Sequence, residues 1–247
     1  MKGIVLAGDS GSKLYPLTLG VPKQLLPVYD RPMIFYPLET LAQIGIKEVL
    51  VITTEEHQEA FKKTLGAGET FGLNLTYAVQ ERPEGVAQAL TIARDFACGD
   101  SIVLTTGDCL LFGEGLTEKF KKAIRTVERS GNATIFVSSQ NDAEQFGIAI
   151  PNDKRKCKSL QDEPLKTGMY YSVTGIYFYP NIAIDIASKI EPSERGKLEI
   201  TSVNEHFHQK GKLQMEILNE KFGWLDTNTI ENLFKASVAI SKKKIKN

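Results

Sequence analysis

The chain has 247 residues and a mass of 27.4 kDa, a length that suits one large α/β domain or two small ones. Hydrophobic residues make up 42% of the chain and charged residues 24%, which excludes a disordered or fibrous protein. The 30 Lys and Arg residues balance the 30 Asp and Glu residues, and this zero net charge argues against general binding to nucleic acid.

The sequence has no pattern typical of export or of a membrane span. The small and apolar run before Asp9 is too short for a signal peptide. No apolar stretch approaches the roughly 20 residues that a membrane span needs. The three cysteines, Cys98, Cys109 and Cys157, lack CxxC spacing, so neither a disulfide framework nor a zinc knuckle is indicated. We therefore expect a cytoplasmic protein with neither membrane nor nucleic acid as a partner.

The first half of the chain alternates apolar runs with amphipathic segments. We expect strands at Lys2–Ala7, Glu48–Thr53, Leu73–Val79, Ser101–Thr105 and Ala133–Ser138. We expect helices at Met33–Ile44, Glu55–Leu65, Val86–Phe96 and Glu114–Arg129. Apolar strands separated by helices predict a mostly parallel sheet that is covered on both faces. A ligand would then bind at the edge where the carboxyl ends of the strands meet.

The pattern changes from Phe146 onward, where the polar joins become longer. Further strands, as antiparallel additions to the sheet, are expected at Phe146–Ile150, around Leu160, at Tyr170–Tyr179 and at Leu213–Leu218. Helices are expected at Ile182–Ile190, Ile200–Gln209 and Ile230–Ile240. No linker separates the two halves, so we interpret residues 1–247 as one domain.

The loop after the first strand carries the first functional pattern. Gly8 and Gly11 would let backbone N–H groups turn toward a phosphate, and Lys13 would add a positive charge. The glycines are weak evidence alone, because tight turns between a strand and a helix also favour glycine. The loop matches neither G-x-x-x-x-G-K-[ST] nor G-x-G-x-x-G.

Longer motifs make the pattern specific. They are KQLLPVYDRPMIFYPL from Lys23, VQERPEGVAQA from Val79, TTGD ending at Asp108, EQFGIA from Glu144, SVTGIYFY from Ser172, RGKLEIT from Arg195 and WLDTNT from Trp224. In this order they resemble the sugar-1-phosphate nucleotidyltransferases, most closely the thymidylyltransferase branch. The resemblance implies a Rossmann-like α/β nucleotide-diphospho-sugar transferase fold, with a nucleotide-binding part at about 1–140 and a sugar-phosphate-binding part at about 141–247.

The reaction implied by the resemblance is transfer of a nucleotidyl group from a nucleoside triphosphate, with dTTP expected, to a sugar 1-phosphate, with glucose 1-phosphate expected. Its nucleophile is already an anion, so catalysis needs positioning and neutralisation of charge rather than a general base. The resemblance assigns Mg²⁺ to Asp108 and Asp226 and assigns phosphate contacts to the catalytic residues Lys13 and Lys23. Without the family context, Asp108 reads as a helix N-cap, Asp226 as a turn residue and Lys23 as a solvated surface charge.

The remaining site residues also come from the resemblance. Those assigned to the nucleotide are Leu6, Gly8, Gly11, Gln80, Pro83 and Gly85. A glutamine amide presents both a donor and an acceptor to a pyrimidine edge, although Gly85 is equally explained as a turn before a helix. Those assigned to the sugar phosphate are Gly147, Asp162, Val173, Thr174 and Arg195. Family members commonly form homo-oligomers, and we expect one here.

Several positions depart from the family's pattern. Asp9 replaces a glycine, Lys13 an arginine, Cys109 an asparagine, Glu163 a lysine, Ser202 an aspartate and Asn228 a glycine. Lysine keeps the charge of arginine but loses its bidentate fork. The sequence is therefore compatible with two functions, an active nucleotidyltransferase and a catalytically weak paralogue that binds nucleotide or nucleotide sugar in a regulatory or assembly role.

Overall fold

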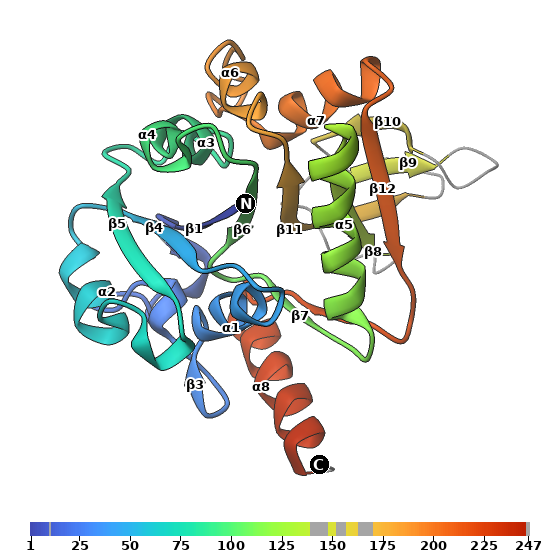
Figure 1. Cartoon of the computed structure of the whole chain (residues 1–247). Helices are drawn as coiled ribbons and strands as arrows, with labels where there is room; N and C mark the ends of the chain where they lie inside the picture. The colour runs from blue at the N-terminus through green and yellow to red at the C-terminus, as the bar shows by residue number, and fades with distance from the viewer. Residues whose placement is uncertain (10, 139–147, 152–156, 163–169, 246–247) are drawn as a thin grey trace.

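The computed structural model of the chain describes residues 1–9, 11–138, 148–151, 157–162 and 170–245. Its centre is a mixed sheet with helices on both faces (Figure 1). The parallel part has the order β5 (Asn74–Val79), β4 (Glu48–Thr53), β1 (Lys2–Ala7) and β6 (Ile102–Thr106). This confirms the expected parallel sheet of the first half.

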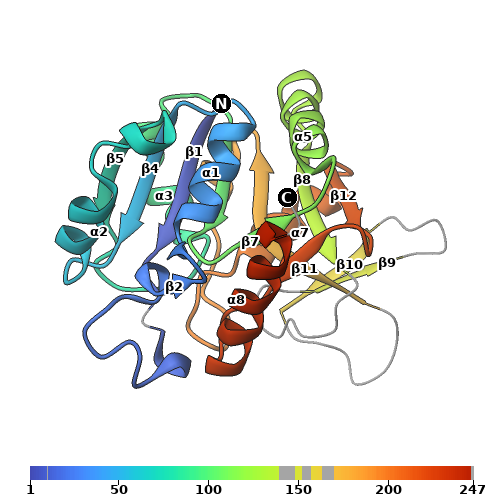
Figure 2. The same cartoon turned by 90° about the horizontal axis from the view of Figure 1, so that it is seen from below.

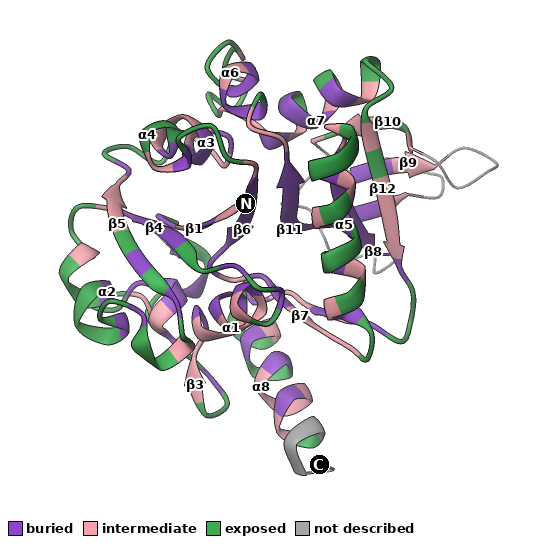
Figure 3. Ribbon diagram, in the orientation of Figure 1, coloured by how far each residue is buried: buried purple, intermediate pink, exposed green. Residues whose placement is uncertain are grey.

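A single long strand joins the two halves of the sheet. β11 (Tyr171–Tyr179) pairs antiparallel with β6 on one side and with β8 (Ala133–Ser138) on the other. Every residue of β11 is buried (Figure 3). Beyond it, β9 (Ile148–Pro151) and β10 (Cys157–Gln161) add antiparallel pairs. The antiparallel additions are therefore confirmed for these strands.

One of the expected antiparallel additions differs. β12 (Leu213–Leu218) runs parallel to β8, with Leu213 opposite Ala133 and Leu218 opposite Ser138. The connection from β8 to β12 is long and ends in α7 (Ile200–Gln209), as the pairing of two parallel strands requires a crossover.

Alternating side chains of the central strands feed two hydrophobic clusters. Ile4 of β1 and Leu104 of β6 point to one face, where they pack with α3 (Gln88–Ile92), α4 (Arg94–Ala97), α6 (Ala183–Ala187) and α7. Val5 and Val103 point to the other face, against α1 (Phe35–Gln43), α2 (Gln58–Leu65) and α5 (Leu116–Ser130). A strand covered on both faces needs such continuous apolar runs.

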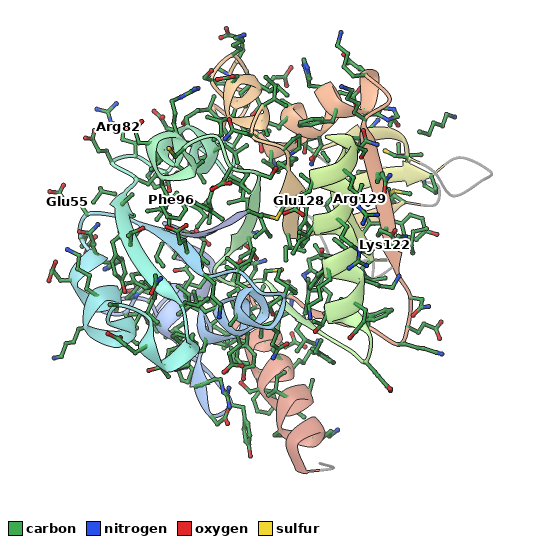
Figure 4. All side chains as sticks on the ribbon, viewed as in Figure 1. Glu55, Arg82, Phe96, Lys122, Glu128 and Arg129 are labelled. Carbon is green, nitrogen blue, oxygen red and sulfur yellow. The ribbon has the colours of Figure 1, made fainter. Side chains whose placement is uncertain are left out.

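Helix α5 shows how a polar segment covers one of these faces. Its buried residues Leu116, Phe120, Ala123 and Val127 recur at helical spacing along one side. Lys122, Glu128 and Arg129 lie on the exposed side in Figure 4.

The helix expected at Val86–Phe96 is instead two short helices, α3 and α4, because the backbone leaves helical geometry at Ala93 (φ −81°, ψ 4°).

Short elements build the floor of the site. β7 (Leu110–Phe112) pairs with β13 (Gly223–Leu225), and β2 (Pro27–Val28) pairs with β3 (Arg31–Pro32). The 3₁₀ turns are η1 (Ser12–Leu14), η2 (Lys23–Leu25) and η3 (Glu69–Phe71). α8 (Ile230–Ile245) packs beside β2, and Leu233, Ala236 and Ile240 of this helix share a cluster with Leu14 and Val28 (Figure 2). The C-terminal helix thus supports the loop that follows β1.

Candidate active site

The candidate site lies at the edge of the sheet where β1 and β6 end. Asp9 follows β1, and Asp108 follows β6. Asp226 reaches the same edge because β13, which ends at Leu225, pairs with β7 beside Asp108. The carboxyl ends of parallel strands are the usual binding edge of such a sheet.

Lys23 is the centre of the site, although it belongs to a residue type that is rarely buried. It opens η2 directly after Pro22, and only 1% of its side chain is exposed. Its Nζ donates hydrogen bonds to Asp108 Oδ2 and Asn228 Oδ1, and lies 3.7 Å from Asp9 Oδ2. The alternative that Lys23 is a solvated surface charge is therefore wrong.

The charges in this cluster hold one another ionised. Burial alone would lower the pKa of Lys23, but the carboxylates of Asp108 and Asp9 outweigh it and leave that pKa raised. Burial would raise the pKa of Asp108, but the Lys23 ammonium outweighs it and leaves that pKa lowered. Asp108 does not cap a helix, since the short strand β7 follows it.

Asp226 is held by hydrogen bonds from two asparagines. Its Oδ1 accepts from the backbone N of Asn228 at 2.9 Å and from Asn228 Nδ2 at 2.5 Å. Its Oδ2 accepts from Asn232 Nδ2 at 2.7 Å. The bond to the backbone two residues on is the turn role that the sequence alone suggested. This turn does not keep Asp226 away from Lys23, because Asn228 contacts both residues.

A cavity of about 290 Å³ opens beside this cluster. Its lining comprises Leu6, Gly8, Asp9, Gln24, Gln80, Pro83, Gly85, Val86, Thr106, Asp108, Lys197 and Asn228. Five of the six residues assigned to the nucleotide lie here, together with one of the two carboxylates assigned to metal. The fold thus gathers most of the residues assigned to the nucleotide in one place.

Gln80 lines this cavity even though only 2% of it is exposed. Its backbone N donates to Thr53 O at 2.7 Å, and its Nε2 donates to Gln88 Oε1 at 2.5 Å. Its Oε1 lies against Gly8, where an added Cβ would collide with it. The amide is therefore fixed by its neighbours before any ligand arrives.

A smaller cavity of about 90 Å³ lies under the loop after β1. It is lined by Asp9, Gly11, Ser12, Lys13, Leu14, Lys23 and Asn228. Lys13 is exposed here, and Asp9, with 57% of its side chain exposed, accepts from the backbone N of Gly11 at 3.2 Å. Asp9 and Asn228 line both cavities and so form the wall between them.

Four residues of the larger cavity, Gln24, Val86, Thr106 and Lys197, were not among the site residues predicted from the sequence. Lys197 donates to Pro83 O from the turn before α7. Gln24 is 1% exposed, and its Oε1 has no hydrogen-bond partner within the described part of the chain. All four lie inside the quoted motifs, for example Gln24 in the motif that begins at Lys23 and Lys197 in the one that begins at Arg195, and this membership is the signal that could have found them.

Four of the five residues assigned to the sugar phosphate are described by the structure, and they lie outside the larger cavity. Val173 and Thr174 are buried within β11, and Thr174 Oγ1 donates to Phe136 O at 3.0 Å. Arg195 Nη2 is paired with Glu199 Oε1 at 3.1 Å. Asp162 is half-buried just after β10, and none of these four lines the larger cavity. Gly147 and Glu163 lie outside the described residues, so the sugar-phosphate assignments stay predictions.

Cys109 turns away from the site. Its thiol is buried and donates to Thr174 O at 2.9 Å, and burial raises its pKa. Its replacement of the family's asparagine therefore changes the packing behind the site rather than the wall of either cavity.

The donor set of the site suits a hard cation. Asp108, Asp226 and the amide of Asn228 offer only oxygen ligands, which Mg²⁺ prefers. Within the described residues, no group of three or more His, Cys, Asp or Glu side chains forms a complete metal cage.

Within the same part of the chain, no helix is long and apolar enough to cross a membrane.

Comparison with known proteins agrees with this geometry. A protein-family model described as nucleotidyl transferase matches residues 2–243. The glucose-1-phosphate thymidylyltransferase of Neisseria meningitidis is 43% identical over 237 residues, covering 96% of this chain and 81% of the relative. That of Xanthomonas campestris is 44% identical over 236 residues, covering 96% and 79%. A solved Bacillus anthracis structure, assigned as a glucose-1-phosphate thymidylyltransferase and complexed with sucrose, superposes with a TM-score of 0.86 at 34% identity, covering 97% of this chain and 94% of that one.

Proposed function

Since the chain belongs to the nucleotidyl transferase family, we propose that it transfers a thymidylyl group from dTTP to glucose 1-phosphate and releases pyrophosphate. The observation that carries the proposal is the buried Lys23 ammonium, held between Asp108 and Asn228, two residues that line the cavity containing Gln80. A buried cation beside a polar cavity is suited to an anionic ligand such as a triphosphate.

The proposed chemistry is a single displacement at phosphorus. An oxygen of the sugar 1-phosphate forms a bond to the α-phosphorus of dTTP while the bond to the β-phosphate oxygen breaks. No proton has to be removed from the nucleophile, so no general base is required. Lys23 and Lys13 bind and orient the phosphates, and the fixed amide of Gln80 hydrogen-bonds the thymine edge.

The residues that would hold Mg²⁺ are Asp108 and Asp226, whose oxygen donors fit this ion. When bound, the ion supplies neutralisation of the phosphate charge and alignment of the reacting groups. One ammonium faces the three carboxylates of Asp9, Asp108 and Asp226, which leaves a net charge of −2 at the cluster. A divalent cation would balance that charge.

The alternative function, a weak paralogue with a regulatory or assembly role, is not favoured. Relatives at 43–44% identity carry the name of an active enzyme class. Of the departures that suggested the alternative, Cys109 faces the core, whereas Asp9 and Lys13 do line the smaller cavity. These two are expected to modulate turnover rather than abolish it.

We also propose that residues 1–247 act as one domain, since β11 pairs with strands from both halves. A homo-oligomer and a cytoplasmic location are further proposals, and their basis is the resemblance and the sequence.

A pyrophosphate-release assay with dTTP, UTP, CTP, ATP and GTP against glucose 1-phosphate tests the function. We expect Mg²⁺-dependent release that is fastest with dTTP and at least a hundredfold slower in Asp108→Asn. Absence of release with every triphosphate, from protein that is folded by circular dichroism, would remove the proposal. Pyrophosphate release that is fastest with another triphosphate would support the proposed reaction but show that the nucleotide is not dTTP.

A further inference from the structure

The side chain of Asn228 joins the Lys23 ammonium to the carboxylate of Asp226. Its Oδ1 accepts from Lys23 Nζ, and its Nδ2 donates to Asp226 Oδ1 at 2.5 Å. Lys23 Nζ also donates to Asp108. A continuous chain of hydrogen bonds therefore runs from Asp108 through Lys23 and Asn228 to Asp226.

The bond between Asn228 and Lys23 is buried, and the bond between Asn228 and Asp226 is partly buried. Asn228 is 8% exposed and Lys23 is 1% exposed. Bonds of a charged group with a buried partner are stronger than those at a surface. The ammonium of Lys23 is therefore held among oxygens of Asp108, Asn228 and, at 3.7 Å, Asp9.

This arrangement competes with a divalent cation for the same oxygens. An ion that uses both Asp108 and Asp226 takes an oxygen that Lys23 now contacts and an oxygen that Asn228 now contacts. It also brings positive charge next to the ammonium. The side chain of Asn228 opposes this exchange from both ends, because it holds Lys23 at one end and Asp226 at the other.

We propose that Asn228 is a positioning residue that keeps the Lys23 ammonium in the place of the divalent cation until phosphates draw the lysine away. The proposal rests on the proposed function, which assigns the cation to Asp108 and Asp226. In this role Asn228 sets a weak affinity for the ion in the absence of nucleotide, and it couples binding of the ion to binding of the triphosphate.

The first test measures Mn²⁺ binding to the full chain without nucleotide, by electron paramagnetic resonance of the free ion. We expect Asn228→Ala to bind Mn²⁺ about tenfold more tightly than wild type. The matched control is Asn232→Ala, which also removes a donor to Asp226 but does not contact Lys23; we expect a change of less than threefold. Weaker Mn²⁺ binding by Asn228→Ala than by wild type would show that Asn228 is a ligand of the ion. Equally tighter Mn²⁺ binding by Asn228→Ala and Asn232→Ala would show that the contact with Lys23 does not matter. Either result overturns the proposal. Asn228→Gly serves in place of Asn228→Ala if the latter does not fold.

The second test follows the lysine itself. Reductive methylation with mass spectrometry gives the labelling rate of Lys23, normalised to the exposed Lys121 of α5. We expect Asn228→Ala to raise the rate at least threefold without metal, and Mn²⁺ to raise it in wild type. A rate that Mn²⁺ leaves unchanged or lowers in wild type would show that the ion does not displace the ammonium, which contradicts the proposal.

The two proposals fail in different ways. If wild type releases pyrophosphate with Mg²⁺, but Asn228→Ala matches it in Mn²⁺ affinity and in Lys23 labelling, only the role of Asn228 is lost. If neither wild type nor Asn228→Ala binds Mn²⁺ or turns over dTTP, the proposed metal site, the proposed function and the role of Asn228 are all wrong.

Discussion

Gly85 and Leu198 approach each other so closely that a side chain at position 85 would collide with the Leu198 carbonyl oxygen. The backbone of Gly85 also has a φ of +126°, which residues with a side chain rarely adopt. Leu198 N donates to Glu84 O at 2.6 Å, and Ala87 N donates to Leu198 O at 3.2 Å. Backbone hydrogen bonds therefore tie the segment around Gly85, which lines the larger cavity, to the segment before α7. Gly85 thus does more than form a turn.

We expect Gly85→Ala to lower the free energy of unfolding by about 2–4 kcal/mol, since backbone strain of about 1–3 kcal/mol adds to the collision. Gly45→Ala is the matched control, because its φ is +91° but an added Cβ meets no described atom within 4 Å. Urea denaturation measures both. A loss in Gly85→Ala no greater than in Gly45→Ala would mean that the contact with Leu198 is unimportant.

Gln80→Ala is expected to weaken binding of dTTP by about 1–3 kcal/mol, the magnitude of a lost buried hydrogen bond. Gln88→Ala should give a smaller loss, because Gln88 does not line the larger cavity and its Oε1 accepts hydrogen bonds from Gln80 Nε2 and Glu84 N. Isothermal titration calorimetry measures the two affinities. Unchanged affinity in Gln80→Ala would exclude a contact between this amide and the base.

Asp9→Asn is expected to tighten triphosphate binding two- to fivefold, which corresponds to about 0.5–1 kcal/mol for a largely exposed charge. The variant removes a carboxylate that lies 3.7 Å from the Lys23 ammonium and lines both cavities. Asp95→Asn, an exposed position on α4, controls for net charge. Weaker binding in Asp9→Asn would show that Asp9 supports Lys23 rather than repelling the ligand.

Lys13→Arg is expected to raise kcat up to about tenfold with little change in KM, because a guanidinium can contact two oxygens of the transferring phosphoryl group. Lys13 is exposed at the smaller cavity, so a longer side chain has room. Steady-state kinetics beside Lys121→Arg as control provide the comparison. A change confined to KM would place Lys13 in ground-state binding only.

Asp108→Asn is expected to cost about 3–5 kcal/mol of stability at pH 7, because it leaves a buried ammonium without its main partner. The pKa of Asp108 is lowered from its usual 3.8, so the stability it contributes is present above that value and is lost as the pH falls through the lower pKa of the folded state. Urea denaturation from pH 7 to pH 2.5 should therefore show the difference between wild type and Asp108→Asn narrowing only below about pH 4. A difference that narrows above pH 5 would contradict the lowered pKa.

The strands were predictable where an apolar run lies between clear turn signals. Lys2–Ala7, Glu48–Thr53 and Ala133–Ser138 match their expected bounds, since both faces of the sheet select apolar side chains. The interruption at Ala93 was not predictable, because alanine favours a helix and the segment Val86–Phe96 holds no glycine or proline. The pairing of β7 with β13 joins residues more than a hundred positions apart, and no local pattern encodes it.

The site divides in the same way. The motifs predicted site roles for Gly8, Gln80 and Asp108, and all three line the larger cavity. The motifs did not predict that Lys23 would be buried. Burial of a lysine depends on partners from distant segments, here Asp108 and Asn228. Lys197 escaped notice for the opposite reason: an exposed lysine in a turn resembles any solvated charge until the fold places it beside Pro83.

The position of β11 in the middle of the sheet has a consequence for synthesis of the chain. β6 ends at Thr106, but its partner β11 is complete only at Tyr179. At ~5–20 residues per second, the nascent chain therefore carries an open sheet edge for roughly 4–15 s. An unpaired apolar edge is a template for aggregation. We therefore expect the ribosome-bound first half to be the state of this chain most prone to aggregation.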